Sequence, residues 1–306
     1  MNSTTDLLSA LVPTSFFNDP WSDEAKSMWV PIVAYWAYSI IFEFIMHAEI
    51  PFFEQYRIHT SEDMKKRNRV TMSKVLLMVA AQQAVQFIIG VMLIQPSDDP
   101  VKQKLEQEAF TASLAAHIYN VLAPYTPSIA AVSDQIAWAL YNVAWPCVQF
   151  FLGMVIMDTH QYFLHRLFHL NKTLYKHIHS HHHRLYVPYA FGALYNHPIE
   201  GFLLDTVGAT LSYELTGMSP RLGMLFFTFS NMKTVDDHCG YSFPWDPLQV
   251  LFGNNVVYHD IHHQPYGIKT NFSQPYFTFW DTILGTRFTK KRDAKKVEDN
   301  KEAKKN

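Results

Sequence analysis

Three long stretches without charged residues, or nearly so, dominate the first half of the chain. Residues 75–94 and 136–157 are uncharged, and each has the length of roughly 20 residues that a helix needs to cross a bilayer core. Pro146 lies inside the second stretch and predicts a kink. Residues 29–46 form a third candidate, in which Glu43 requires a buried or interfacial environment. Three such stretches favour a membrane protein over a soluble protein with long core helices.

The second half contains shorter apolar runs at residues 201–213 and 222–230, separated by Glu214, Pro220 and Arg221. Each run is short for a full span, so the pair predicts a helical hairpin that dips into the membrane or crosses it as a kinked pair. The expected fold is therefore all-α, with polytopic membrane helices and a cytosolic, helical, histidine-rich catalytic cap.

Charge in the loops predicts the orientation. The connection between the first two spans is basic, whereas acidic residues outweigh basic ones in the next connection; the basic residues are Arg57, Lys65, Lys66, Arg67, Arg69 and Lys74, and the acidic ones are Asp98, Asp99, Glu106 and Glu108. The positive-inside rule places the first loop, the histidines and the C-terminal tail in the cytosol. That tail resembles a lysine-based retrieval signal of the endoplasmic reticulum, although Lys304 and Lys305 lie one place too close to the terminus. We expect a multi-pass protein of the endoplasmic reticulum membrane.

The predicted organisation has four parts: a lumenal N-terminal segment (1–27), transmembrane helices (28–158), a histidine-rich catalytic region (159–286) that includes an apolar hairpin (201–230), and a charged, disordered cytosolic tail (287–306). Composition argues against one class of partner and one way of stabilising the fold. The formal net charge of −2 argues against nucleic acid as a partner, and two cysteines rule out a disulfide framework. The mean hydropathy of −0.07 averages polar tails with very apolar stretches, so it does not contradict the membrane prediction.

Histidine is the residue type that carries the chemistry. Thirteen of the sixteen histidines fall between His160 and His263, and eight form three clusters: His165 and His169; His179, His182 and His183; His259, His262 and His263. Residues three or four apart share a face of an α-helix, so each cluster is expected to point its rings one way. His177 and His181 would point to the opposite side. Three clusters supply more imidazoles than a single four- to six-coordinate ion uses, which predicts two metal ions.

The sequence says less about the role of the other histidines and of the acidic residues near the clusters. Isolated histidines such as His47, His59 and His117 are expected to have structural roles or none, and His160 is about 140° away from the face of His165 on a helix. A histidine that binds a metal through one ring nitrogen usually donates a hydrogen bond from the other nitrogen to an acceptor. Candidates by proximity in sequence are Asp158, Asp236, Asp237 and Asp260, each of which could equally be a capping or solvent-facing residue.

The motifs HRLFH, HSHHH and HDIHH, framed by YKHIHSHHHRLYVPYAFGALYNHPIEGF and TVDDHCGYSFPWDP, resemble the membrane fatty acid hydroxylase superfamily. HHHRLYVPYAFGALYNHPIEGFLLDT and NNVVYHDIHHQPYGIKTNFSQPYFTFWDTILGT are similar to the sphinganine C4-hydroxylases in particular. The similarity runs from about Asp158 to Thr286.

This resemblance implies a non-haem di-iron centre that uses O2 and electrons from NADH, delivered by cytochrome b5 and its reductase. The implied reaction inserts one oxygen atom into sphinganine or dihydroceramide and gives phytosphingosine-type products. The implied catalytic metal ligands are the eight clustered histidines together with His238. His197 occupies another family histidine position, and its alternative role is a hydrogen bond that holds the turn at Pro198.

The chemistry agrees with these implications. Attack on an unactivated C–H bond needs a redox-active metal, which zinc is not, although zinc could replace iron in a purified sample. The Glu-x-x-His motif of soluble di-iron bundles is missing from the histidine region. An acidic residue should meet the substrate ammonium, and Glu200 and Asp236 are candidates. Aromatic residues that could line an acyl tunnel are Phe226, Phe227, Phe229, Phe243 and Trp245.

Two alternatives stay open. Another oxidation within the superfamily, such as sterol C-5 desaturation or C-4 methylsterol oxidation, would use the same ligands. A non-catalytic membrane protein that binds or transports metal would instead place acidic residues or histidines along a path inside the membrane. The histidines here follow the predicted spans.

Overall fold

The computed structural model describes residues 19–93 and 100–289 and is all-helical over these residues. Three helical stretches are long and apolar enough to cross a membrane: α3 (Asp23–Ala48), α6 (Met72–Leu93), and the stretch that runs from Ser133 through α8 (Ser133–Ala139) and η2 (Leu140–Ala144) to the end of α9 (Trp145–Leu170). They coincide with the three predicted spans, and the protein is a multi-pass membrane protein by this criterion. The only β-type pairing among the described residues is an isolated bridge between Arg57 and Tyr241.

A hairpin completes the bundle. α12 (Val207–Thr216) packs against α9, and α13 (Pro220–His238) packs along α3. The two helices are joined at Gly217, whose φ of 63° lies in the left-handed region that favours glycine. Ser219 then caps α13, with Pro220 at its first position. α12 and α13 overlap the two apolar runs at residues 201–213 and 222–230, and α13 continues to His238.

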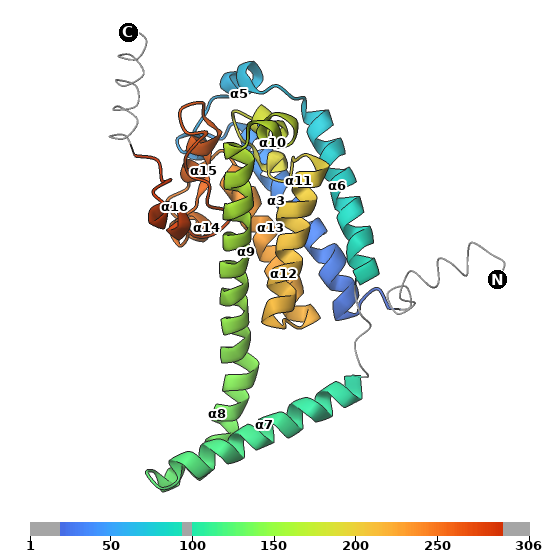
Figure 1. The fold of residues 1–306 in the computed structure, drawn as a ribbon, viewed down its shortest axis with the longest axis vertical. Helices are drawn as coiled ribbons and strands as arrows, with labels where there is room; N and C mark the ends of the chain where they lie inside the picture. Colours follow the sequence, from blue (N-terminus) through green and yellow to red (C-terminus); the bar gives the residue numbers. More distant parts are fainter. Residues whose placement is uncertain (1–18, 94–99, 290–306) are drawn as a thin grey trace, which may run out of the picture.

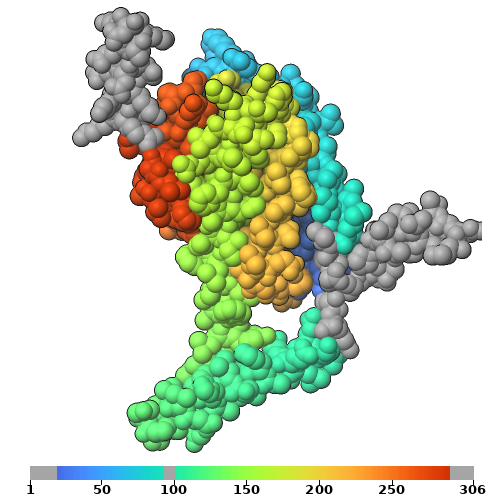
Figure 2. All heavy atoms as spheres, viewed as in Figure 1, coloured from blue at the N-terminus to red at the C-terminus, as the bar shows by residue number. Residues whose placement is uncertain are grey.

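The remaining elements are short, apart from α7. They are α4 (Pro51–Glu54), α5 (Ser61–Arg67), α7 (Pro100–Leu122), η1 (Pro127–Ala131), α10 (Lys172–His177), η3 (His179–Arg184), η4 (Ala190–Gly192), α11 (Pro198–Gly201), η5 (Phe202–Thr206), α14 (Pro247–Val250), α15 (Val256–His263) and α16 (Phe279–Ile283). Figure 1 shows α5, α10, α11 and α15 gathered at one end of the bundle. α7 packs against α8 at the opposite end and extends away from the body, as Figure 2 also shows. The histidine region thus forms a cap on one end of the membrane helices.

Near Pro146, where a kink was predicted, the long helical stretch departs from the regular α-helical hydrogen-bond pattern. Proline has no N–H to donate, and its ring clashes with the carbonyl four residues earlier. The π-helical segment η2 lies directly before Trp145 and Pro146, and it accommodates this mismatch. Beyond Pro146, α9 continues without a break across the domain boundary predicted at Asp158. The helix that spans the membrane therefore also carries His165 and His169 into the cap.

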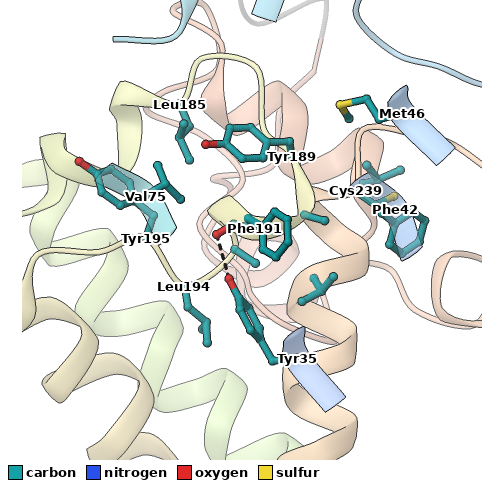
Figure 3. Packing of buried hydrophobic residues seen from close by; sticks show 14 of the residues in the cluster. Tyr35, Phe42, Met46, Val75, Leu185, Tyr189, Phe191, Leu194, Tyr195 and Cys239 are labelled. Atoms are coloured by element: carbon teal, nitrogen blue, oxygen red, sulfur yellow. Dashed lines mark hydrogen bonds between the residues drawn. The ribbon is translucent and has the colours of Figure 1, made fainter. Parts of the chain in front are cut away.

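The core beneath the cap anchors the loop that follows the second histidine cluster. Tyr35 of α3 is fully buried, and its hydroxyl donates a 2.8 Å hydrogen bond to the carbonyl of Phe191 (Figure 3). Leu185 and Tyr195 belong to the same apolar cluster, together with Val75 of α6. Burial of these side chains fixes the path of residues 185–195 over the membrane helices. Two carbonyls of this loop orient histidines, as described below.

Several predictions fall on residues outside the described ranges. These residues are the N-terminal part of the predicted lumenal segment, the acidic pair Asp98 and Asp99, and the tail with its retrieval-like lysines. At the other boundary, α3 begins at Asp23, so its first turn lies within the segment predicted to precede the membrane helices.

Candidate metal centre

The structure gathers nine histidines into two buried groups. The five-histidine group contains His165, His169, His179, His183 and His262, and the four-histidine group contains His182, His238, His259 and His263. Within each group, one ring nitrogen from every member lies within 4.8 Å of the others. The groups adjoin each other, since the rings of His182 and His183 lie 5.6 Å apart. This is the arrangement of a dinuclear site.

The sequence clusters do not map one to one onto these groups. His179 and His183 join the five-histidine group, but His182 between them joins the other. In HDIHH, likewise, His259 and His263 share one group while His262 belongs to the other. The prediction that each three-histidine cluster points one way was wrong. Residues four apart stay together, but an adjacent residue is rotated by about 100° or more and faces the neighbouring group.

The second cluster also differs from the prediction in its local structure. His179–Arg184 form the 3-10 helix η3, with His179, His182 and His183 all buried. α10 ends just before it, at His177, which is exposed as expected. The change of helix type lets one short segment supply both metal groups.

Backbone carbonyls fix the orientation of most of the rings. The Nδ1 atoms of His165, His182, His238, His262 and His263 lie 2.7–3.1 Å from the carbonyl oxygens of Phe272, Tyr195, Thr234, Thr270 and Leu185 respectively. A carbonyl can only accept, so each of these Nδ1 atoms carries the proton. In a neutral ring, the Nε2 atom is then left with a lone pair.

The Nε2 atoms converge within each group. In the five-histidine group, Nε2 of His179 lies 3.1 Å from that of His165, 2.6 Å from that of His169 and 2.9 Å from that of His183. In the four-histidine group, Nε2 of His259 lies 3.0 Å from that of His238 and 3.1 Å from that of His263. Nε2 of His262 is buried without any hydrogen-bond partner. Nitrogens without protons repel each other at such distances unless a cation lies among them, so the donor set suits two metal ions.

Burial keeps these imidazoles neutral. It lowers the pKa of His182 to about 4 and the pKa of His262 to about 3, because the cationic form loses its hydration in the interior. Neutral imidazole is the form that binds metal, so the rings are ready ligands at neutral pH.

The aspartates considered as ring partners have other contacts. Asp158 accepts from the backbone N–H groups of Tyr276 (3.0 Å) and Phe277 (2.6 Å). Asp236 accepts from Gln249, Asp237 pairs with Lys233, and Asp260 accepts from His59 at 2.7 Å. In the described part of the chain, none of the four hydrogen-bonds a ring of either group. They fix the scaffold. The backbone beside the carbonyl that orients His165 is held by Asp281, which accepts from the N–H groups of Phe272 (3.0 Å) and Ser273 (2.7 Å).

Glu200 is the ring partner that sequence reasoning missed. Its carboxylate contacts Nδ1 of His179, and both side chains are about 1% exposed. Burial, followed by the nearby Asp205, raises the pKa of Glu200 well above its usual value. Glu200 was considered as a partner for a substrate amine, but this geometry commits it to His179. The signal available in the sequence was its place beside Pro198, at the start of α11.

His197 does not join either group. It is the N-cap of α11, and its Nδ1 accepts from the backbone N–H of Ile199 at 3.2 Å. The alternative role, holding the turn at Pro198, is the one that the structure shows. His160 also lies apart, with Nε2 2.8 Å from the carbonyl of Leu203.

A cavity of about 510 Å³ lies among α3, α6, α9, α12 and α13. A smaller hollow of about 30 Å³ lies against His179, His182, His238 and His259. Gln161, Asp205 and Thr234 line both spaces, which places them where the large cavity meets the metal centre. The large cavity runs from these residues to Met28 and Gly90 on the membrane helices.

Of the five aromatic residues predicted to line a tunnel, only Phe227 lines this cavity. Phe226 is fully buried in the core, and Phe229 stacks on Tyr276. Phe243 and Trp245 stack on each other. Small and polar residues line much of the cavity instead, among them Ala209, Thr210, Ser230 and Asn231.

Comparison with known proteins agrees with this geometry. Residues 150–286 match the model of the fatty acid hydroxylase family. The chain is 48% identical over 272 residues to the sphingolipid C4-hydroxylase of Schizosaccharomyces pombe, covering 87% of this chain and 89% of that protein. It is 44% identical over 265 residues to sphinganine C4-monooxygenase 2 of Arabidopsis thaliana, covering 87% and 88%.

A third relative has a different name. The chain is 42% identical over 271 residues to a very-long-chain aldehyde decarbonylase of Oryza sativa subsp. japonica, covering 87% of this chain and 91% of that protein. No solved structure matches the chain significantly. The family match covers both histidine groups, and the full-length relatives extend it over the membrane helices. The chain therefore belongs to the fatty acid hydroxylase family.

Proposed function

We propose that this protein is a sphingolipid long-chain-base C4-hydroxylase. It inserts one oxygen atom from O2 into the C4–H bond of sphinganine or dihydroceramide and gives phytosphingosine-type products. The observation that carries the proposal is the pair of converging imidazole groups at the end of a lipid-sized cavity in a membrane bundle. The names of two relatives with matching coverage support this substrate class.

The proposed metal is iron, with one ion in each histidine group. His165, His169, His179, His183 and His262 would hold one ion, and His182, His238, His259 and His263 the other. When bound, two iron ions supply the redox chemistry that O2 activation and C–H attack require, which zinc lacks. The protein's own contribution is orientation, because backbone carbonyls and Glu200 hold the rings. Burial of the groups also excludes bulk water from the reacting end of the cavity.

The proposed electron source is NADH, through cytochrome b5 and its reductase. α5 carries Lys65, Lys66 and Arg67 in its last turn, at the same end of the bundle as the histidines. Arg67 contacts Gln264, the residue after His263. A donor that docks over α5 would lie next to the four-histidine group.

We also propose that the protein resides in the endoplasmic reticulum membrane with the histidine cap in the cytosol. The basic residues of the loop between α3 and α6 support this orientation under the positive-inside rule. A lipid could then enter from the bilayer with its polar end near the cap.

Lipid analysis of cells that express the chain tests the function. Accumulation of 4-hydroxysphinganine, lost in the His182→Ala variant, is the expected result. The name of the rice relative makes alkane formation from long aldehydes a second candidate activity. Alkanes or altered sterols with unchanged sphingoid bases would overturn the proposal.

A further inference from the structure

Asp205 occupies the junction between the lipid cavity and the metal centre. It lies in η5, immediately before α12, and it lines both the large cavity and the hollow against His179 and His238. A molecule that extends from the cavity to the histidines must therefore pass this carboxylate.

Two amide side chains hold the carboxylate in place. Oδ2 of Asp205 accepts from Nε2 of Gln82 at 3.1 Å and from Nδ2 of Asn196 at 3.4 Å. Gln82 can approach because residue 201 is glycine: a Cβ there would lie 2.3 Å from Oε1 of Gln82. Asp205 thus has a fixed position.

No cation of the described residues balances the charge of Asp205. Among the residues that the structure describes, no lysine, arginine or histidine forms an ion pair with it, whereas the buried Asp237 pairs with Lys233. Both hydrogen bonds to Asp205 fall on Oδ2, so Oδ1 is not engaged by a donor of the described residues. A carboxylate charge withdrawn from bulk water is costly unless a cation meets it.

We propose that Asp205 binds the ammonium group of a free sphingoid base and thereby sets C4 at the metal centre. This inference rests on the proposed function and deepens it. The ammonium group is on C2, two carbons from the reacting C4, so the residue that binds it must lie beside the histidines. The rest of the chain then lies in the large cavity, toward Met28 and Gly90.

The two acidic residues favoured by the sequence do not fill this role. Glu200 contacts His179, and Asp236 accepts from Gln249 and does not line the large cavity. Asp205 is the acidic residue that lines both spaces. It is a specificity-determining residue for a cationic lipid and makes the free base the preferred substrate.

The test compares sphinganine with octadecane-1,3-diol, which keeps both hydroxyls but lacks the amine. Binding to the full-length, metal-loaded protein in lipid nanodiscs is measured without O2, so that no turnover occurs. The wild type should bind sphinganine about 10-fold more tightly than the diol, or better, as expected for a hydrogen bond between charged groups. Equal affinities would overturn the proposal whatever the variants do.

Asp205→Asn is the informative variant, because it removes the charge and keeps the shape. It should weaken sphinganine binding by about 10-fold or more and leave diol binding nearly unchanged. The KM for sphinganine should rise in parallel, with both metal ions retained. Glu108→Gln, on the distant α7, is the matched control and should change none of these values.

Other outcomes contradict the role of Asp205. Equal weakening of both ligands, or loss of metal in Asp205→Asn, would show a structural role. Unchanged sphinganine binding would do the same. These results differ from failure of the proposed function, in which wild-type membranes would hydroxylate no sphingoid base at all.

Discussion

Six of the nine histidines in the two groups are oriented by an atom that their Nδ1 nitrogen contacts. Most of these atoms are backbone carbonyls, such as those of Leu185 for His263 and Thr270 for His262. A carbonyl leaves no mark in a sequence, because every residue has one. The choice of aspartates as ring partners therefore failed, whereas the grouping of histidines four residues apart was readable from the sequence.

The second and third sequence clusters each contribute histidines to both metal groups, so single substitutions should change the metal content by different amounts. His182→Ala removes one of four ligands from its group, and we expect it to lose one of the two ions and all C4-hydroxylation. His262→Ala leaves four imidazoles in its group, so it should lose activity but retain more metal. Elemental analysis of the purified variants measures this difference.

His177→Ala is the control for both variants, since this side chain is exposed. It should keep both ions and most of the activity. Equal metal loss in all three variants would contradict the two-group assignment.

Glu200→Gln tests the carboxylate that contacts the ring of His179. The amide keeps the size of the side chain but removes the charge that stabilises the Nδ1–H form of His179. We expect metal affinity or activity to fall by roughly 10- to 100-fold. Titration of the metal-free protein with Fe²⁺ measures the affinity, and Glu62→Gln on the exposed face of α5 serves as the control. Unchanged affinity would show that Glu200 does not orient His179.

At the scale of elements, hydropathy located the three spans because a nearly uncharged length of about 20 residues is a direct physical requirement of the bilayer. It did not reveal that α9 runs on into the cap or that His179–Arg184 form a 3-10 helix. Both features depend on how the cap packs. Local periodicity is also ambiguous around HSHHH, because His177, two residues before the motif, and His181 form a second pair with helical spacing.

The turn after α15 depends on a glycine. A Cβ on Gly267 would lie 1.8 Å from the carbonyl oxygen of Ile261, which is backbone in the helix that carries His259, His262 and His263. Gly267→Ala must therefore displace that helix. We expect a loss of about 3 kcal/mol in stability and loss of metal from both groups.

Thermal unfolding in detergent and metal analysis measure these effects. Gly285→Ala is the control: a Cβ there meets nothing within 4 Å, although its φ of 63° carries a strain of about 1 kcal/mol. A Gly267→Ala protein as stable as Gly285→Ala would show that the turn can relax without moving α15.

At the scale of the whole molecule, the membrane helices expose large apolar side chains, such as Phe44 and Leu77, which are 67% and 69% exposed. Helices that are apolar on all sides are stable where lipid surrounds them. The histidine cap lies at one end of this body and α7 at the other. The two ends should therefore face different compartments.

Accessibility to a membrane-impermeant maleimide tests the orientation in sealed microsomes. Lys172→Cys places an exposed thiol in the cap, and Ala109→Cys places one on α7. Cys147 is replaced by alanine to remove background, while Cys239 is fully buried. The positive-inside rule predicts labelling of Lys172→Cys in intact vesicles and of Ala109→Cys only after permeabilisation. The reverse pattern would place the cap in the lumen, where a cytosolic electron donor could not reach the histidines.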